Sequence, residues 1–120
     1  MAIRAIRGAI QVSENSVSAL QFSVPRLLRS LLEENVISYS EIVSILFTAT
    51  PDLTADFPAA AARALPLGDV PLICASEIAV PGALERVIRV LLHVETEKSR
   101  AEIKHVYLDG AEALRKDLAQ

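Results

Sequence analysis

The chain has 120 residues, of which 52% are hydrophobic and 22% are charged, a composition that suits a single folded domain over residues 1–120. Its net charge of −3 argues against nucleic-acid binding, which usually needs a basic face, and its single cysteine cannot form an intrachain disulfide. The sequence contains neither a secretion signal nor the roughly 18 uninterrupted apolar residues of a membrane span, so we expect a cytoplasmic protein without a membrane partner.

The first half of the chain predicts a strand, a helix and a second strand. The Ile-rich segment 2–12 indicates a strand, and its period of two places Arg7 on one face together with apolar neighbours. Apolar residues recur at helical spacing over 20–34, which predicts an amphipathic helix that Pro25 should kink, unless this proline marks the start of its regular part. The β-branched and aromatic residues of 41–50 predict a mostly buried strand.

A short alanine-rich helix is expected after this second strand. Asp56 suits the N-cap position, and Pro58 lies just inside the first turn, where its missing N–H costs nothing. Pro66 and Gly68 should end the helix near Leu65.

Three further strands are expected in the second half. Residues 70–78 indicate the first of them. Residues 84–95 fit both helical and strand periodicity, and their β-branched side chains favour a strand from about Arg86. Residues 103–108 predict the last strand, before a short helical piece over 111–118.

No segment shows the spacing of a metal, nucleophile or phosphate motif. His93 and His105 lie on separate predicted strands, so we expect no metal site. Cys74 lies in an apolar strand without a neighbouring base in the sequence, although a distant histidine could approach it in the fold. We therefore expect neither a metal nor a cofactor.

Several charged side chains do lie within apolar segments, where an ionised group needs an opposite charge, hydrogen bonds or a ligand. Glu77 and Arg89 stand in the apolar stretch 70–94, and Arg7 and Arg63 lie in or beside other apolar elements. Guanidinium groups bind carboxylates through paired hydrogen bonds, so this set suits a small polyanion in a dry cleft. The residues alone also allow each arginine to lie on a solvated face.

Four segments of the sequence resemble the AroH-class chorismate mutases. They are IRAIRGA near the start, FTATPDLTADFPAAAAR (47–63), VPLICASEIAVPGALERVIRV (70–90) and HVYLDGAEALRKDL (105–118). The resemblance implies an α+β fold of the chorismate mutase II-like type, with a mixed sheet of about five strands and two main helices. It also implies a homotrimer that forms a pseudo-α/β barrel, with active sites at the subunit interfaces. The apolar share, which is high for so small a domain, independently indicates an oligomer.

The same resemblance implies an enzyme of aromatic amino acid biosynthesis that rearranges chorismate to prephenate, a Claisen step without cofactor or metal. Arg89 corresponds to the cation beside the ether oxygen of chorismate, where negative charge gathers in the transition state. Arg7 corresponds to the residue that binds a substrate carboxylate. Glu77 corresponds to the residue that accepts the ring hydroxyl proton and faces Arg89.

Further substrate contacts are implied for a larger set of residues, namely Phe57, Arg63, Leu72, Ile73, Cys74, Ala75, Ser76, Tyr107, Leu114 and Arg115. Three positions depart from the family pattern: Ala60 stands where some members have lysine, Ile73 replaces a threonine, and Lys116 replaces a proline. The alternative function is a non-catalytic trimeric module that binds a carboxylated metabolite between subunits.

Overall fold

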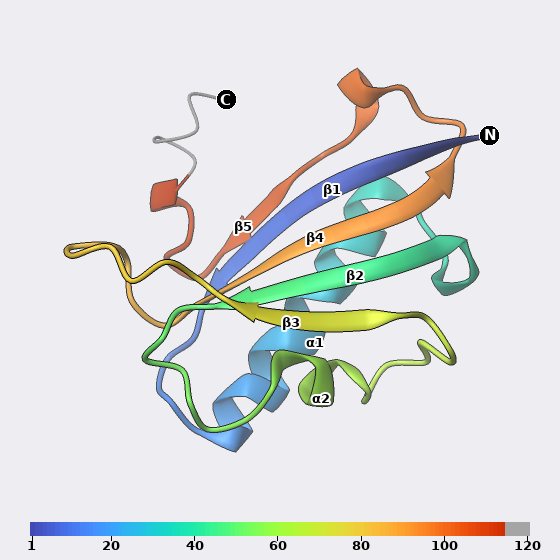
Figure 1. The fold of residues 1–120 in the computed structure, drawn as a ribbon. Coiled ribbons are helices and arrows are strands. Elements are labelled where there is room, and N and C mark those ends of the chain that lie inside the picture. Colours follow the sequence, from blue (N-terminus) through green and yellow to red (C-terminus); the bar gives the residue numbers. More distant parts are fainter. Residues whose placement is uncertain (115–120) are drawn as a thin grey trace.

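A computed structural model describes residues 1–114 of the chain. Five strands form one mixed sheet and two α-helices accompany it, as Figure 1 shows. In chain order the elements are β1 (Ala2–Gln11), α1 (Val17–Asn35), β2 (Ile42–Ala49), α2 (Pro58–Ala62), β3 (Leu72–Ser76), β4 (Val87–Thr96) and β5 (Val106–Leu108). This arrangement confirms the expected α+β class.

The central strand of the sheet is β4, in the order β3-β2-β4-β1-β5. It pairs antiparallel with β1 on one side and with β2 on the other. The outer strands are parallel to their neighbours, β3 to β2 and β5 to β1. The strand interpretation of the ambiguous segment 84–95 is therefore correct, because β4 begins at Val87.

Helix α1 packs against one face of the sheet. Leu27, Leu28 and Leu31 on its inner side are buried. Gly8 on β1 allows the helix to approach closely, since a Cβ at this position would lie only 2.8 Å from Cδ1 of Leu31. The main core thus forms between α1 and the helix-facing side of the sheet.

The beginning of α1 is fixed by Ser16, whose hydroxyl accepts the N–H of Ala19 at 3.1 Å. The helix continues through Pro25, so this proline does not mark its start. Within residues 1–114, no helix is long and apolar enough to cross a membrane.

Helix α2 differs from its expected boundaries. Its N-cap is Phe57, not Asp56, because Pro58 occupies the first helical position and the cap must directly precede it. The Asp56 carboxylate instead accepts the N–H of Phe57 at 2.7 Å. The helix ends at Ala62, before the expected Leu65.

Strands β3 and β5 are shorter than expected because each pairs with only part of its neighbouring strand. The pairing of β3 with β2 ends at Ala49 and Ser76, where β2 itself ends. The pairing of β5 with β1 covers only Gly8–Ile10 on the β1 side. The sequence favours a strand from residue 103, but β5 begins only at Val106. A short 3-10 helix, Arg100–Glu102, lies just before this segment.

Helices α1 and α2 lie on the same side of the sheet, and neither of them covers the other side, here called the open face (Figure 1). Ile3 and Ala5 on β1 are exposed there, and Ile73 on the edge strand β3 is 65% exposed. Within residues 1–114, the open face is covered at one end by a small core of Ala9, Val87, Tyr107 and Ala111, with Leu84 and Leu114 packed against it.

The segment 77–86 between β3 and β4 is a loop with apolar side chains in solvent. Ile78 is 85% exposed, and Val80 is exposed as well. Its two ends are nevertheless fixed, by Glu77 at the end of β3 and by Arg86 at the start of β4. The Glu77 end lies at the cavity described next.

Candidate active site

A cavity of about 190 Å³ lies on the open face of the sheet, close to its covered end. Strands β1, β2, β4 and β5 contribute lining residues directly, and Glu77, which follows β3, also lines the cavity. Within residues 1–114 the lining consists of Arg7, Gly8, Ala9, Leu46, Thr48, Glu77, Arg89, Val90, Leu91 and Tyr107. Residues that are far apart in the sequence thus meet in one hollow.

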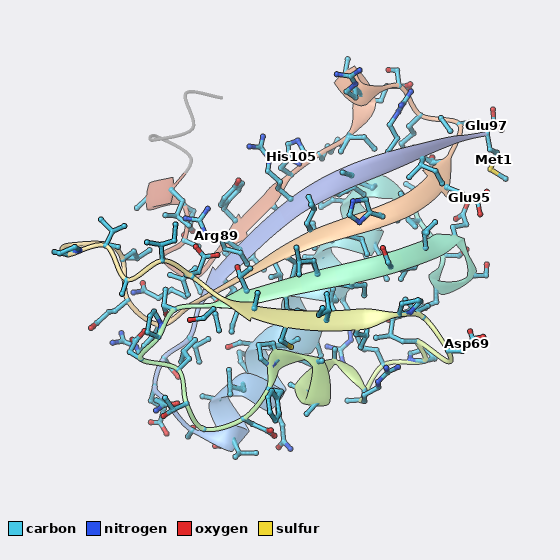
Figure 2. The ribbon with its side chains drawn as sticks, in the orientation of Figure 1. Met1, Asp69, Arg89, Glu95, Glu97 and His105 are labelled. Atoms are coloured by element: carbon cyan, nitrogen blue, oxygen red, sulfur yellow. The ribbon has the colours of Figure 1, made fainter. Side chains whose placement is uncertain are left out.

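The strand register brings the polar residues of this cavity together. Arg89 on β4 lies opposite Ala9 on β1 and opposite Thr48 on β2. Tyr107 on β5 is the partner of the same Ala9. Because successive side chains alternate between faces, these side chains and Arg7 all project onto the open face. Figure 2 shows Arg89 at the end of the sheet away from Met1.

Glu77 reaches the cavity from the edge of the sheet. Its backbone N–H donates to the carbonyl oxygen of Ala49 at 2.9 Å, which extends the β2–β3 pairing by one bond. Its Oε2 accepts a hydrogen bond from the hydroxyl of Thr48, and its Oε1 lies 3.7 Å from Nε of Arg89. The side chains of Arg89 and Glu77 are 40% and 25% exposed, so the pair is accessible to a ligand.

Arg7 is held in place through its backbone. Its N–H donates to Nδ1 of His105 at 2.9 Å, just before the parallel pairing of β1 with β5 begins at Gly8 and Val106. This bond assigns Nδ1 of His105 as an acceptor. Tyr107, two residues further along the chain from His105, is buried in the small core and also lines the cavity.

The start of β4 is fixed by Arg86, which has a left-handed backbone with a φ of 53°. Its N–H donates to Oδ2 of Asp52 at 2.9 Å, and its Nε donates to the carbonyl oxygen of Val12 at 2.9 Å. Burial acts to raise the pKa of the Asp52 carboxyl, but hydrogen bonds from Thr50 and from the backbone of Asp52 and Arg86 outweigh it and hold the pKa below its ordinary value. An ionised Asp52 thus holds the strand that presents Arg89.

Four predicted site residues line a different cavity. Phe57, Cys74, Ala75 and Ser76 belong to a hollow of about 560 Å³ between β3 and the segment 49–58. Phe57 is 71% exposed at its rim, while Cys74 also packs against the main core. One chain therefore presents the predicted site as two separate surfaces.

The remaining predicted residues within 1–114 line neither cavity. Leu72 packs against the main core, and Ile73 points to solvent from β3. Arg63 follows α2, and its Nη1 donates to the carbonyl oxygen of Gly68 at 3.1 Å. Leu114 packs against the small core beside Tyr107. Arg115 and Lys116 lie outside the described residues.

Several lining residues were not predicted from the sequence. Thr48 is polar, whereas Leu46 and Leu91 form part of the apolar wall of the cavity. A threonine within a strand gives no signal of its own, because only the pairing of β2 with β4 places it opposite Arg89. Strand register was therefore the missing information.

The lining can bind an anion without a metal. Among the described residues of the lining, two guanidinium groups and one carboxylate give an excess of positive charge, and guanidinium groups are well suited to binding carboxylates. Among residues 1–114, no group of three or more His, Cys, Asp and Glu side chains is placed to hold a metal ion. The arrangement can therefore orient an anionic substrate and stabilise negative charge that develops in a reaction.

The chain is similar to known proteins over nearly its whole length. The family described as chorismate mutase type I matches residues 3–118. The chain is 47% identical to the chorismate mutase AroH of Thermus thermophilus, over 97% of this chain and 96% of that protein. It is 40% identical to the chorismate mutase AroH of Bacillus subtilis, over 99% and 94% respectively. A solved structure of a chorismate mutase from Clostridium thermocellum superimposes with a TM-score of 0.89 at 46% identity, covering 92% of this chain and 98% of that one.

Proposed function

Because this chain belongs to the chorismate mutase type I family, we propose that Arg7, Glu77 and Arg89 are the catalytic residues of its reaction, the rearrangement of chorismate to prephenate. The chain is accordingly an isomerase of aromatic amino acid biosynthesis. One observation supports this assignment above others: a single cavity contains Arg7, Arg89, Glu77 and Tyr107, and Arg89 faces Glu77 at 3.7 Å. A cytoplasmic location remains part of the proposal.

The proposed mechanism is electrostatic. When the C–O bond of chorismate breaks ahead of C–C bond formation, negative charge gathers on the ether oxygen. We assign the Arg89 guanidinium to that oxygen, because a fixed donor in an enclosed site contributes roughly 3–4 kcal/mol to transition-state stabilisation. Arg7 is assigned to a substrate carboxylate, and Glu77 to the ring hydroxyl, whose proton it accepts in a hydrogen bond. The cavity also has to hold the reactive conformer in the correct orientation.

The size of the cavity supports a site shared between subunits. Its volume of about 190 Å³ is below the roughly 300–1,000 Å³ of typical ligand pockets. The second cavity contains Phe57, Cys74, Ala75 and Ser76, which the family resemblance implies as substrate contacts. We propose that this second surface of one subunit closes the first cavity of its neighbour.

A homotrimer would provide this closure and also cover the open face. Ile3, Ala5 and Ile73 are exposed on that face in a single chain, and apolar surface of this kind is usually buried in an assembly. A closed ring of three copies uses the same two complementary surfaces at every interface. The trimeric barrel expected from the sequence is therefore part of this proposal.

Turnover is tested by following the loss of chorismate ultraviolet absorbance with purified protein in the presence of a chelator. We expect cofactor-free conversion to prephenate in the unmodified protein and a loss of activity in Arg89→Ala. Binding of chorismate without turnover would contradict the catalytic proposal and indicate a binding module.

Sharing of the site is tested by mixing two inactive variants. Arg89→Ala removes the cation from the first cavity, and Ala75→Glu places a carboxylate in the second, where it should repel the anionic substrate. After dissociation and reassembly of an equal mixture, about a quarter of the sites should combine two intact surfaces and regain activity. No recovery would mean that each chain builds its site alone.

A further inference from the structure

We propose that Thr48 is a positioning residue for this reaction: its hydroxyl holds the Glu77 carboxylate so that Arg89 remains available to the substrate. The inference rests on the role proposed above for Glu77. Thr48 lies on β2 directly opposite Arg89 of β4, and both residues line the cavity on the open face.

The contacts of the Glu77 carboxylate are unequal. Oε2 accepts the hydrogen bond of the Thr48 hydroxyl, whereas Oε1 lies 3.7 Å from Nε of Arg89. An N–H···O hydrogen bond spans about 2.7–3.2 Å, so the arginine contact is an ion pair at longer range. Among the residues that the structure describes, the hydroxyl is thus the group that fixes the carboxylate.

Glu77 needs such support because of its place in the chain. It directly follows the edge strand β3 and begins the exposed loop 77–86, in which Ile78 is 85% exposed. Its backbone is tied to Ala49, but its side chain has to extend across β2 to reach Arg89. A long side chain in that position has several rotamers of similar energy unless a neighbour selects one.

The hydroxyl also affects how Arg89 is used. A carboxylate with two free oxygens can take two parallel N–H bonds from one guanidinium. Such a forked pair would occupy donors that the ether oxygen of the substrate needs. Because Thr48 occupies Oε2, Glu77 offers Arg89 one oxygen at long range and keeps acceptor capacity for the substrate hydroxyl. Threonine suits this task since its β-branched side chain has few rotamers in a strand.

The test compares Thr48→Val, which keeps the shape and loses the hydroxyl, with Thr48→Ser, which keeps the hydroxyl. We expect Thr48→Val to lower kcat/KM roughly 10- to 100-fold, as for other small misplacements of catalytic groups, and Thr48→Ser to retain most of the activity. Ser44→Ala removes a hydroxyl further along the open face of β2 and should leave kcat/KM unchanged. Thermal unfolding of each variant reports whether the fold is intact.

A double-mutant cycle with Glu77→Ala separates positioning from a structural effect. If Thr48 acts through Glu77, Thr48→Val should cause little further loss once Glu77 is alanine. Near-normal turnover in Thr48→Val, or the same fold-loss in both backgrounds, would overturn the inference. Normal turnover in Glu77→Ala alone would instead overturn the proposed role of Glu77, so the two failures can be distinguished.

Discussion

Arg89 combines a partly exposed guanidinium with a fixed position in the central strand, between Ala9 and Thr48. Its planar fork can face Glu77 with one N–H and the substrate with others, which a single ammonium group cannot reproduce. The geometry of the side chain is therefore expected to matter as much as its charge.

We predict that Arg89→Lys lowers kcat/KM by about 10²–10³-fold, the usual effect of losing one well-placed donor in such a site. Steady-state kinetics with chorismate measures the loss. Arg29→Lys, on the exposed side of α1, is the matched control and should behave as the unmodified protein. Near-normal turnover in Arg89→Lys would contradict the assignment of Arg89 to the ether oxygen.

Glu77 is predicted to work by hydrogen bonding more than by its charge. Glu77→Gln keeps an oxygen acceptor for the substrate hydroxyl, so it should retain far more activity than Glu77→Ala, by about tenfold or more in kcat/KM. The same absorbance assay compares the two variants. Equal losses would mean that the negative charge itself is required.

At this scale the sequence was informative where a residue type was unusual for its surroundings. Charged side chains in apolar strands indicated Arg7, Glu77 and Arg89, and all three line one cavity. Thr48 was missed, because hydroxyl side chains are common in strands and nothing local distinguishes this one. Cys74 was placed beside them only by family resemblance, and within one chain it lines another cavity.

At the scale of elements, the close approach of α1 to β1 depends on Gly8. A Cβ at this position would lie 2.8 Å from Cδ1 of the buried Leu31, so the helix or the leucine would have to move. Since Gly8 lies between Arg7 and Ala9, such a shift would reach the lining of the cavity.

We therefore predict that Gly8→Ala lowers the free energy of unfolding by about 1–3 kcal/mol, the range found for overpacked cores. Urea denaturation of both proteins measures the difference. In a Leu31→Ala background the added methyl group has room, so Gly8→Ala should then cost much less. An equal cost in both backgrounds would show that the contact with Leu31 is not the cause.

The ion pair of Arg26 and Asp109 connects α1 to the turn after β5. Nε and Nη2 of Arg26 each lie 3.1 Å from one carboxylate oxygen. Hydrogen bonding to this guanidinium lowers the pKa of Asp109 below its ordinary value of 3.8. The depressed pKa means that the pair contributes stability above about pH 3.8, and that this contribution is lost as the pH falls through the lower pKa of the folded state.

We predict that Asp109→Asn has a lower urea midpoint than the unmodified protein at pH 7, and that the two midpoints converge below pH 3.8. The effect should be small, since both side chains are about two-fifths exposed. Asp69→Asn, at an exposed aspartate before β3, is the control and should have the same urea midpoint as the unmodified protein at pH 7. A gap that persists to low pH would mean that the pair is not responsible.

Sequence patterns predicted which segments form helices and strands, but they did not predict the residues at which several of these elements begin and end. Alternation in 2–12 and helical spacing in 20–34 identified β1 and α1, because both patterns reflect burial on one face. The limits of β3 and β5 depend on how many residues of the neighbouring strand each one pairs with, which a single segment does not contain. The predicted N-cap of α2 was wrong by one residue, because Pro58 occupies the first helical position and Phe57 directly precedes it.

At the scale of the whole molecule, helices α1 and α2 cover one face of the sheet, and the open face carries exposed apolar side chains. The open face includes both exposed apolar residues and the cavity with Arg7 and Arg89. Assembly and activity are therefore expected to depend on the same surface.

We predict that Ala5→Asp, which places a charge on the open face outside the cavity, dissociates the proposed trimer and lowers activity at the same protein concentrations. Light scattering coupled to size-exclusion chromatography measures the mass of the assembly. Gln21→Asp, on the exposed side of α1, should leave both properties unchanged. A trimer that persists in Ala5→Asp would show that another surface holds the subunits together.

The high apolar share of the sequence indicated an assembly, but its geometry came only from family resemblance. Composition records how much surface has to be buried. It does not record where that surface lies, because this depends on which strands become edges and which face the helices occupy.

The loop 77–86 separates the two opposite charges of the cavity in the sequence, although both are attached to paired strands. Glu77 is tied to β2 through Ala49 and Thr48, while Arg89 belongs to the ten-residue ladder of β1 and β4. A proteolytic nick at the tip of the loop would cut the covalent link and leave every one of these bonds in place. The two halves of the charge pair thus depend on the sheet, and not on the loop, for their alignment.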